Sequence, residues 1–373
     1  MTLAPSSEKY GLKSGTPALR SVGPITFGPD GILFVADSDA ATIFAIETGD
    51  APAAEAKALD IENLDTRLAA YLGCPREDVH IRDMAVHPST QDVYLSVMRG
   101  EGNNARPALL TIDTSGGVGE VALEDVAFAQ TSIADAPAED DSRMEVRVGV
   151  MNDPRDGDVM EPRPGFKLRI ARDPLRKVTI TDMAYADGVL LVAGASNEEF
   201  VSTLRRIPFP FGGESASSSL EIFHVSHGKY ETASPIRTLV PFVGNSEVLA
   251  SYTCTPVVHF SLADMASSKQ LKGRTVAELG AGNTPLDMVS YKRDGEEYLL
   301  VSNSRHPLMK IAARDIPGQD ALTEPREPVG VPRENLAQAG VSRMANLNGS
   351  YVLMMQCDES GNIGLRSYSN AAL

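Results

Sequence analysis

The sequence repeats a unit of three short apolar strands, and this repetition constrains the fold more than any other feature. The first readable unit is GPITFGPDGILFVADSDAATIFAIET, residues 23–48, in which a Pro-Asp-Gly turn and a polar turn separate the strands. Units with the same order of events begin at residues 81, 180, 235, 285 and 341, and the copy at 235 is the most divergent. The pattern predicts a series of three-stranded meanders.

Repeats of about 40 to 50 residues that contain several strands are typical of a β-propeller, in which each blade buries its faces against its neighbours. We therefore expect an all-β fold, a single β-propeller domain over residues 1–373 with about six blades. The number of blades could also be seven, because residues 118–176 could hold a degenerate copy of the repeat. The alternative is a generic all-β protein with similar hairpins.

Two segments interrupt the repeats. Residues 60–73 place Leu64, Leu68 and Leu72 on one helical face and end at Gly73, which predicts a short helix over a blade edge. Residues 128–176 contain the acidic run APAEDD and the Pro-rich stretch MEPRPGFK. This composition predicts a long acidic insertion loop between blades.

Charge limits the expected partners. The chain has 34 basic and 50 acidic residues and a formal net charge of -16, which disfavours nucleic acid and anionic lipid. No stretch approaches the ~18 apolar residues of a membrane span. We therefore expect a small-molecule ligand or substrate, with a partner protein as the alternative.

The start MTLAPSSEKYGLKSG is polar and shows no secretory signal. It fits a cytoplasmic protein and also a periplasmic or secreted protein whose signal has been removed. The second location is slightly favoured.

Common cofactor motifs are missing from the sequence. The three cysteines, Cys74, Cys254 and Cys357, show neither CxxC nor CxxCH spacing, and there is no Walker A, Rossmann or GxSxG motif in a suitable context. The chain has no Trp, so it lacks the Trp-docking repeats of quinoprotein propellers. We expect no haem, PQQ or nucleotide.

An Asp-Met pair recurs in the first strand of three units, at Asp83, Asp182 and Asp287, and a fourth copy has Arg343 in place of the acid. The two-residue period of a strand puts each acid on an otherwise apolar face, where a carboxylate must be paired or hydrogen-bonded. One interpretation is that the acids accept backbone N–H groups from the next blade. The other is that they face Arg343 and hold a divalent metal at the channel mouth, calcium being favoured over copper or zinc.

The start of each first strand lies at the same end of a propeller as the turn between the second and third strands. Binding chemistry tends to gather where loops from every blade meet. The turn residues are polar and differ from blade to blade, which suggests an asymmetric ligand. The candidate substrate contacts from these turns and the residues after them are Arg99, Asn197, Asn303, Arg305 and Cys254.

Two of the six histidines, His224 and His227, lie three residues apart and close to Glu231. Imidazole titrates near neutral pH and binds metals, so this group could supply metal ligands or a general acid–base pair. Histidines in ordinary loop hydrogen bonds are the alternative. With His306 and Arg343, these residues are our candidate catalytic groups.

The stretch GPDGILFVADS resembles the repeat of NHL and SMP-30/gluconolactonase propellers, and PLDMVSYKRDGEEYLLVSNSRHPLMKI is loosely similar to a paraoxonase-type blade. The resemblance implies a propeller with calcium held at its axis by Glu, Asn and Asp side chains, where the metal polarises a lactone or ester. Asp287 matches the acid of that motif, whereas Met288 stands where Asn is expected.

Together these patterns favour a small-molecule-binding or metal-assisted hydrolytic propeller, lactonase- or esterase-like, with its site on the loop-rich face of the central channel. Whether the chain is an enzyme is left open, with a metal-dependent hydrolase favoured. A non-catalytic scaffold that binds a ligand or a protein is the first alternative. A copper-dependent oxidoreductase that uses clustered histidines is the second.

Overall fold

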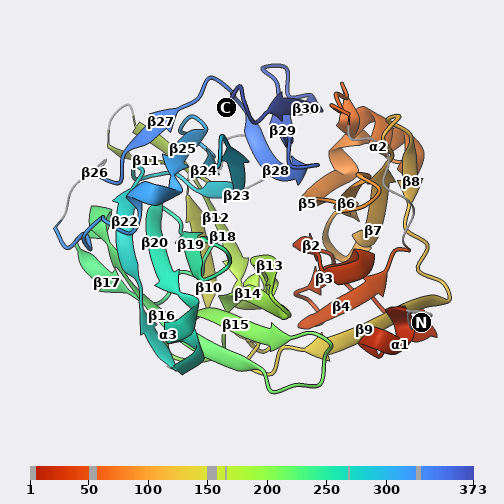
Figure 1. Cartoon of the computed structure of the whole chain (residues 1–373), viewed down its shortest axis with the longest axis horizontal. Coiled ribbons are helices and arrows are strands. Elements are labelled where there is room, and N and C mark those ends of the chain that lie inside the picture. Colours follow the sequence, from red (N-terminus) through yellow and green to blue (C-terminus); the bar gives the residue numbers. More distant parts are fainter. Residues whose placement is uncertain (1–5, 50–56, 149–157, 164–165, 268, 325–328) are drawn as a thin grey trace.

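The computed structural model describes residues 6–49, 57–148, 158–163, 166–267, 269–324 and 329–373, whose strands form seven sheets. Six sheets stand around a common axis, each with one strand beside it (Figure 1). These inner strands belong to the six repeats and are β2 (Ile25–Phe27), β5 (Val79–Val86), β13 (Asp182–Ala186), β18 (Thr238–Phe242), β23 (Pro285–Arg293) and β28 (Val341–Leu347). Each contacts the inner strand on either side, so together they close a ring. The expected six-bladed β-propeller is confirmed.

We number the blades 1 to 6 in the chain order of their inner strands. Each blade adds antiparallel strands outward from the axis. Blade 1 adds β3 (Ile32–Asp37), β4 (Thr42–Glu47), β9 (Val126–Ser132) and β1 (Lys13–Gly15). Blade 2 adds β6 (Val93–Arg99), β7 (Arg106–Ile112) and β8 (Val118–Glu120). Blade 3 adds β14 (Val189–Ala195), β15 (Ser202–Pro208), β16 (Ala216–His224) and β17 (Lys229–Glu231), with β21 (Gln270–Lys272) parallel to β16.

Blade 4 adds β19 (Glu247–Ser251), β20 (Pro256–Ser261), β22 (Arg274–Glu278) and β26 (Val329–Gly330). Blade 5 adds β24 (Glu296–Asn303), β25 (Met309–Ala312) and β27 (Arg333–Asn335), and blade 6 adds β29 (Tyr351–Cys357) and β30 (Ile363–Ser369). Three α-helices complete the described regular structure, α1 (Ser6–Tyr10), α2 (Leu64–Leu72) and α3 (Leu262–Ser267), with 3-10 turns η1 (Pro29–Gly31), η2 (Arg76–Asp78), η3 (Gly102–Asn104), η4 (Leu175–Val178), η5 (Val225–His227) and η6 (Ala313–Asp315). Within the described ranges, none of the helices has the length and apolar character that crossing a membrane requires.

The order of the blades around the axis differs from their order in the chain. Contacts between inner strands give the order 1, 3, 4, 5, 6, 2, so blade 2 lies between blades 6 and 1 (Figure 1). The chain leaves blade 1 after β4, builds blade 2, and returns as β9 to pair with β4. Blade 1 is therefore completed by a strand that follows blade 2 in the sequence.

The outer edge of blade 6 is covered by the segment that leads into blade 2. Ile61 and Leu365 exchange two backbone hydrogen bonds of 2.9 Å, and the Ser367 hydroxyl contacts the backbone of Leu59. Helix α2 follows, within the segment 60–73, and buries Leu64 and Leu68 in the core between blades 2 and 6. Distant parts of the chain are thus joined where the ring closes.

The prediction of a long loop over residues 128–176 is wrong. Besides part of β9, the segment holds a separate three-stranded sheet of β10 (Met144–Val148), β12 (Phe166–Pro174) and β11 (Asp158–Arg163), in which β12 is central. Residues 149–157 and 164–165 of the segment lie outside the described residues. In an ordinary surface strand the apolar residues are buried and the charged residues are exposed. In β10 the charged Glu145 is buried whereas Met144 and Val146 are exposed, so the usual sequence pattern of a strand is inverted. We call this sheet the cap sheet.

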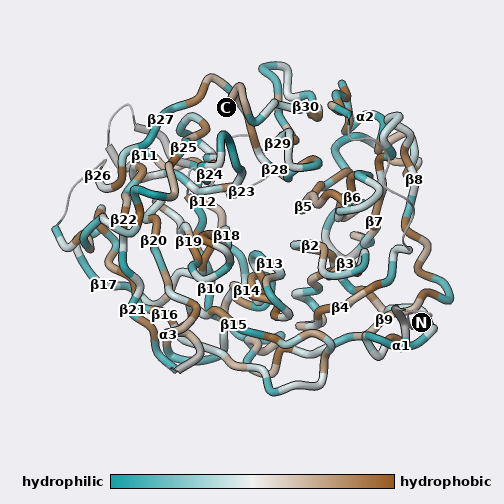
Figure 2. Tube along the Cα trace, in the orientation of Figure 1, coloured by the Kyte–Doolittle hydropathy of each residue, from teal (hydrophilic) through white to brown (hydrophobic). Residues whose placement is uncertain are grey.

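The core lies between the faces of neighbouring blades. Between blades 1 and 3, Ile32 and Phe34 pack with Leu190 and Val192, all of them fully buried. Burying such a side chain contributes about 1.5–3 kcal/mol, so the ring is held mainly by apolar contact. In Figure 2 the hydrophobic residues gather on blade strands such as β19, and the chain next to β15 at the periphery is largely hydrophilic.

Candidate functional site

A cavity of about 750 Å³ lies at the end of the axis where the inner strands begin. Its lining includes residues at the start of the inner strands, together with Ser38 from the turn after β3 and Met98 near the end of β6. Arg147 and Asp173 of the cap sheet also line it, so this sheet covers part of the channel mouth. We call this space the axial cavity.

The three acids of the Asp-Met pairs line the axial cavity. Each carboxylate accepts a backbone N–H group from the next blade around the ring, at distances of 2.5 to 2.8 Å. The pairs are Asp83 with Ile25, Asp182 with Leu239 and Asp287 with Met344. Each also accepts the N–H of the methionine that follows it. The structure thus shows the arrangement of our first interpretation, and the metal role of these acids stays a prediction.

Local backbone irregularity helps to aim these side chains. In β5, β23 and β28 the pairing register shifts immediately before Asp83, Asp287 and Arg343. Such bulges turn a strand locally and redirect the next side chain. The repeated sequence therefore places a polar residue at the same point of three inner strands.

Arg343 joins its blade to both neighbours. Its guanidinium donates to the carbonyl oxygen of Arg82 in blade 2 at 2.7 and 2.9 Å and to that of Leu286 in blade 5 at 3.0 Å. Arg343 Nε also lies 3.6 Å from Asp83 Oδ1. The charge of Arg343 therefore opposes that of the acids, as expected if it neutralises the ring.

Burial raises the pKa of all three acids. The pKa of Asp182 rises to about 7, with a further upward contribution from the charge of Asp83, while hydrogen bonds from Leu239 and Met183 oppose the rise. The pKa of Asp287 is raised well above its usual range, and that of Asp83 is also raised, in both cases against the pull of Arg343. A carboxyl group with a pKa near 7 can exchange protons at neutral pH.

A second group of charges comes from blade 4 and the cap sheet, and its members Arg237, Arg147 and Asp173 line the axial cavity. Arg237 lines the cavity, and its Nε and Nη1 atoms are buried with no hydrogen-bond partner among the described residues. Burial raises the pKa of Glu145 to about 7, opposed by the charge of Arg237, and Ser234 donates to Glu145 at 3.2 Å. Arg147 and Asp173 form an ion pair at 2.6 Å.

The candidate list from the sequence did not include Arg237 or the cap-sheet residues. The available signal was the alternation of MEVRV, residues 144–148, whose charged residues share one face. That alternation could have identified β10 as a strand with a charged inner face.

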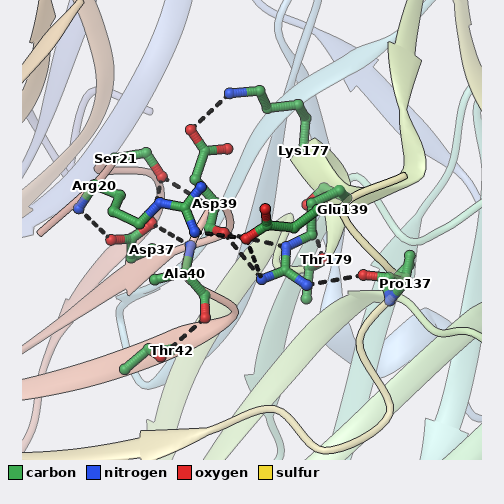
Figure 3. A network of polar contacts seen from close by, with 11 residues as sticks. Arg20, Ser21, Asp37, Asp39, Ala40, Thr42, Pro137, Glu139, Lys177 and Thr179 are labelled. Atoms are coloured by element: carbon green, nitrogen blue, oxygen red, sulfur yellow. Dashed lines mark hydrogen bonds and ion pairs between the residues drawn. The ribbon is translucent and has the colours of Figure 1, made fainter. Parts of the chain in front are cut away.

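The rim of the axial cavity between blades 1 and 3 is fixed by a polar network, shown in Figure 3. Lys177 pairs with the Asp39 carboxylate at 2.6 Å, and Asp37 accepts a hydrogen bond from Ser21 at 2.7 Å. Ser21, Asp39 and Lys177 all line the cavity. These contacts engage polar groups on this part of the rim with each other.

His224, His227 and Glu231 come together beside blade 4. The carboxylate of Glu231 contacts Nδ1 of His224 at 2.7 Å and Nδ1 of His227 at 2.8 Å, and the two rings lie 3.9 Å apart between centroids. Burial would raise the pKa of Glu231, but its contacts with the two histidines outweigh burial and lower the value to about 2. Cys254, which we had placed among the substrate contacts, lies against the two imidazoles.

The other candidates lie elsewhere. Arg99 and Asn197 are exposed and are not part of the axial cavity lining. Asn303 and Arg305 contact Asn283 through hydrogen bonds, which orders the loops next to blade 5. His306 packs so closely on Gly280 that a Cβ atom there would lie 2.6 Å from its Nε2. The structure does not bring these residues into one site.

Comparison with known proteins adds little to this picture. No family model matches the chain, and no curated protein matches it. Solved structures with some likeness include a streptogramin B lyase (10% identity over 96% of this chain and 97% of that one, TM-score 0.29). A second is the selenomethionine-substituted virginiamycin B lyase from Staphylococcus aureus (10% identity over 96% of this chain and 99% of that one, TM-score 0.35). A third is the PQQ-bound aldose sugar dehydrogenase from Streptomyces coelicolor (11% identity over 95% of this chain and 96% of that one, TM-score 0.34).

At these identities and TM-scores the likenesses assign no activity to this chain. The propeller implied by the resemblance to NHL and SMP-30/gluconolactonase blades is present, while the comparisons give no support to that particular superfamily. The fold rests on the strand pairing of the chain itself.

Proposed function

We propose that the protein binds a small molecule with an anionic group in the axial cavity, where Arg237 is the main contact. The observation that carries this proposal is that Arg237 lines the cavity while its buried Nε and Nη1 have no hydrogen-bond partner among the described residues. Buried donors are nearly always satisfied, and a charged one is costly to leave alone. An anionic ligand would supply the missing acceptors.

The chemistry of the surroundings favours a carboxylate or a similar planar anion. A guanidinium presents parallel N–H donors that match a carboxylate in a two-point contact. Two acids of the cap sheet, Glu145 and Asp173, act on Arg237 through their charge, and the pKa of about 7 makes Glu145 only a partial counter-charge at neutral pH. The pairs Lys177–Asp39 and Arg147–Asp173 are already neutralised. Arg237 is therefore the group with most to gain from a bound anion.

The binding test is thermal denaturation and titration calorimetry with short mono- and dicarboxylates, inorganic phosphate, and the neutral amides of the same acids. A ligand that binds only the folded state raises the melting temperature. We expect at least one carboxylate, and not its amide, to stabilise the protein. In the Arg237→Gln variant its affinity should fall at least tenfold, or about 1.4 kcal/mol.

The matched control is Arg99→Gln, which removes an exposed arginine outside the cavity. It should leave anion binding unchanged. The proposal fails if no anion stabilises the protein, or if Arg237→Gln binds the anion as tightly as the unchanged chain.

A second candidate function, hydrolysis of an ester or lactone in the same cavity, is favoured by Asp182. With a pKa of about 7, this carboxyl group is suited to take a proton from water as the water oxygen adds to the carbonyl carbon. The acyl–oxygen bond then breaks, and the leaving alkoxide takes up the proton. Asp182→Asn should abolish turnover of a responsive lactone or ester while it retains anion binding. Unchanged turnover would exclude this role.

A further inference from the structure

The second polar cluster, formed by His224, His227 and Cys254, has the composition of a metal site. One donor atom from each residue lies within 4.8 Å of the other two. His224 comes from the end of β16 in blade 3, His227 from η5, and Cys254 from the turn between β19 and β20 in blade 4. None of the three lines the axial cavity. The cluster is therefore separate from the site of the proposed function.

One imidazole nitrogen of this cluster is an independent sign of a ligand. The side chain of His224 is 5% exposed, and its Nε2 is buried with no hydrogen-bond partner among the described residues. A buried imidazole nitrogen without a partner is unfavourable unless something else binds it. A metal ion would satisfy this nitrogen.

Glu231 orients both rings for this purpose. Its two carboxylate oxygens separately contact Nδ1 of His224 and Nδ1 of His227. A carboxylate in this position holds the proton on Nδ1, which leaves Nε2 as the lone-pair donor. The two Nε2 atoms are then the ones available to a metal.

The thiol of Cys254 is delivered by a constrained turn. Cys254 and Thr255 have φ values of 63° and 60°, in the left-handed region that non-glycine residues rarely adopt. The turn is held by hydrogen bonds from Cys254 N to Asn283 O at 2.7 Å and from Thr255 Oγ1 to Gly280 O at 2.8 Å. The backbone is thus fixed in a conformation that presents the sulfur to the imidazoles.

We propose that His224, His227 and Cys254 bind one divalent transition-metal ion of the zinc type, with Glu231 as the positioning residue behind both imidazoles. Two imidazoles and a thiolate suit zinc and related ions, whereas calcium and magnesium prefer oxygen ligands. Bonds of about 2.0 Å to nitrogen and 2.3 Å to sulfur put tetrahedral donor atoms about 3.5 Å apart, within reach of the observed spacing after small side-chain rotations. Three protein ligands leave a fourth position for water or another ligand, and the 45% exposed side chain of His227 gives solvent access to the cluster.

The test uses the full chain, stripped with a chelator and titrated with Zn(II), Co(II), Ca(II) and Mg(II). We expect one Zn(II) or Co(II) per chain, a higher melting temperature with either ion, and no comparable effect of Ca(II) or Mg(II). The Co(II) form should show a sulfur-to-cobalt charge-transfer band in the near ultraviolet. That band reports cysteine ligation directly and does not depend on any enzymatic activity.

Four variants separate ligation from folding. Cys254→Ser should abolish the charge-transfer band, and His227→Ala, at an exposed position, should weaken Zn(II) binding without unfolding the chain. Glu231→Gln should weaken Zn(II) binding about 10- to 100-fold while it retains the band in the fully loaded protein. Cys357→Ser is the matched control, because this cysteine lies outside the cluster, and it should change neither readout.

The proposal is overturned if the stripped protein takes up neither Zn(II) nor Co(II). It is also overturned if bound Co(II) lacks the charge-transfer band, or if the band survives in Cys254→Ser. If Cys254→Ser loses metal binding and still binds the anion at Arg237, the two sites are independent.

Discussion

The carboxylate of Asp287 accepts the backbone N–H of Met344 at 2.5 Å, which ties blade 5 to blade 6 at the residue that follows Arg343. The same relationship recurs around the ring, because Asp83 and Asp182 bind the N–H groups that follow Pro24 and Thr238. Around the axis, three acids therefore alternate with Pro24, Thr238 and Arg343, and all six positions line the axial cavity. Arg343 thus occupies the same position in its blade as Pro24 and Thr238, directly before the residue whose N–H group binds an acid of the neighbouring blade.

This relationship predicts a clear order of stability among variants of Asp287. Asp287→Ala leaves the N–H groups of Met288 and Met344 without their acceptor and should lower the free energy of unfolding by about 1–3 kcal/mol for each buried donor. Asp287→Asn keeps an acceptor oxygen and resembles the protonated acid, so it should cost less. Urea denaturation at pH 7 measures both.

The control for these variants is Glu198→Ala, at an exposed position, which should change stability by no more than about 0.5 kcal/mol. Equal stability of the Ala and Asn variants of Asp287 would show that the carboxylate does not hold the two blades together.

Asp182 predicts how stability depends on pH. Its folded-state pKa of about 7 lies above the usual value of 3.8, so the folded protein holds a proton that the unfolded chain releases. The resulting stabilisation is fully present below about pH 4 and is lost as the pH rises through 7. Between pH 5 and pH 8 the free energy of unfolding should fall, and Asp182→Asn should reduce that fall by on the order of 1–3 kcal/mol.

Urea denaturation at several pH values gives this slope for both proteins. A fall of the same size in Asp182→Asn would mean that other groups, such as Asp83 and Asp287, account for it. The raised pKa of Asp182 would then lack support.

Arg343 should oppose the same pH effect. Its charge lowers the pKa of Asp83 and Asp287, so Arg343→Met should raise both values further and make the loss of stability at high pH steeper. The variant also loses the hydrogen bonds to Arg82 and Leu286. We therefore expect a larger destabilisation at pH 8 than at pH 5, measured against Arg99→Met. An equal loss at both pH values would show that only the hydrogen bonds matter.

The closure of blade 6 gives a prediction about the backbone. Ile61→Pro removes the N–H that bonds to Leu365 and should cost about 3 kcal/mol, whereas Ile61→Val keeps the bond and should cost about 0.5–1.5 kcal/mol. Hydrogen exchange should also speed up at Leu365 in the proline variant. If exchange at Leu365 is unchanged, this pairing does not protect the blade edge.

The inner strands were predictable because their signal is local. Each repeat carries its own alternation and turns, and Asp83, Asp182 and Asp287 mark the same position in three of them. The position of blade 2 between blades 6 and 1 was not predictable, since nothing within a repeat specifies which blade it packs against. Pairing of Ile61 with Leu365 likewise joins residues near opposite ends of the chain, 304 positions apart.

Parts of the candidate sites were predictable for the same reason. His224, His227 and Glu231 are neighbours in the sequence and meet in the structure, whereas Cys254 joins them from another blade. Arg237 could not be recognised as an anion contact, because its importance depends on a missing partner and on a cap sheet that the sequence presented as a loop.

The most direct test of the anion-binding account is a crystal structure of the full chain soaked in bromide, with anomalous scattering used to locate the anion. The account predicts a bromide ion in the axial cavity within hydrogen-bonding distance of Arg237 Nε and Nη1, and no bromide there in Arg237→Gln crystals. A cavity without bromide, with both nitrogens bonded to Glu145 or another protein group, would contradict it.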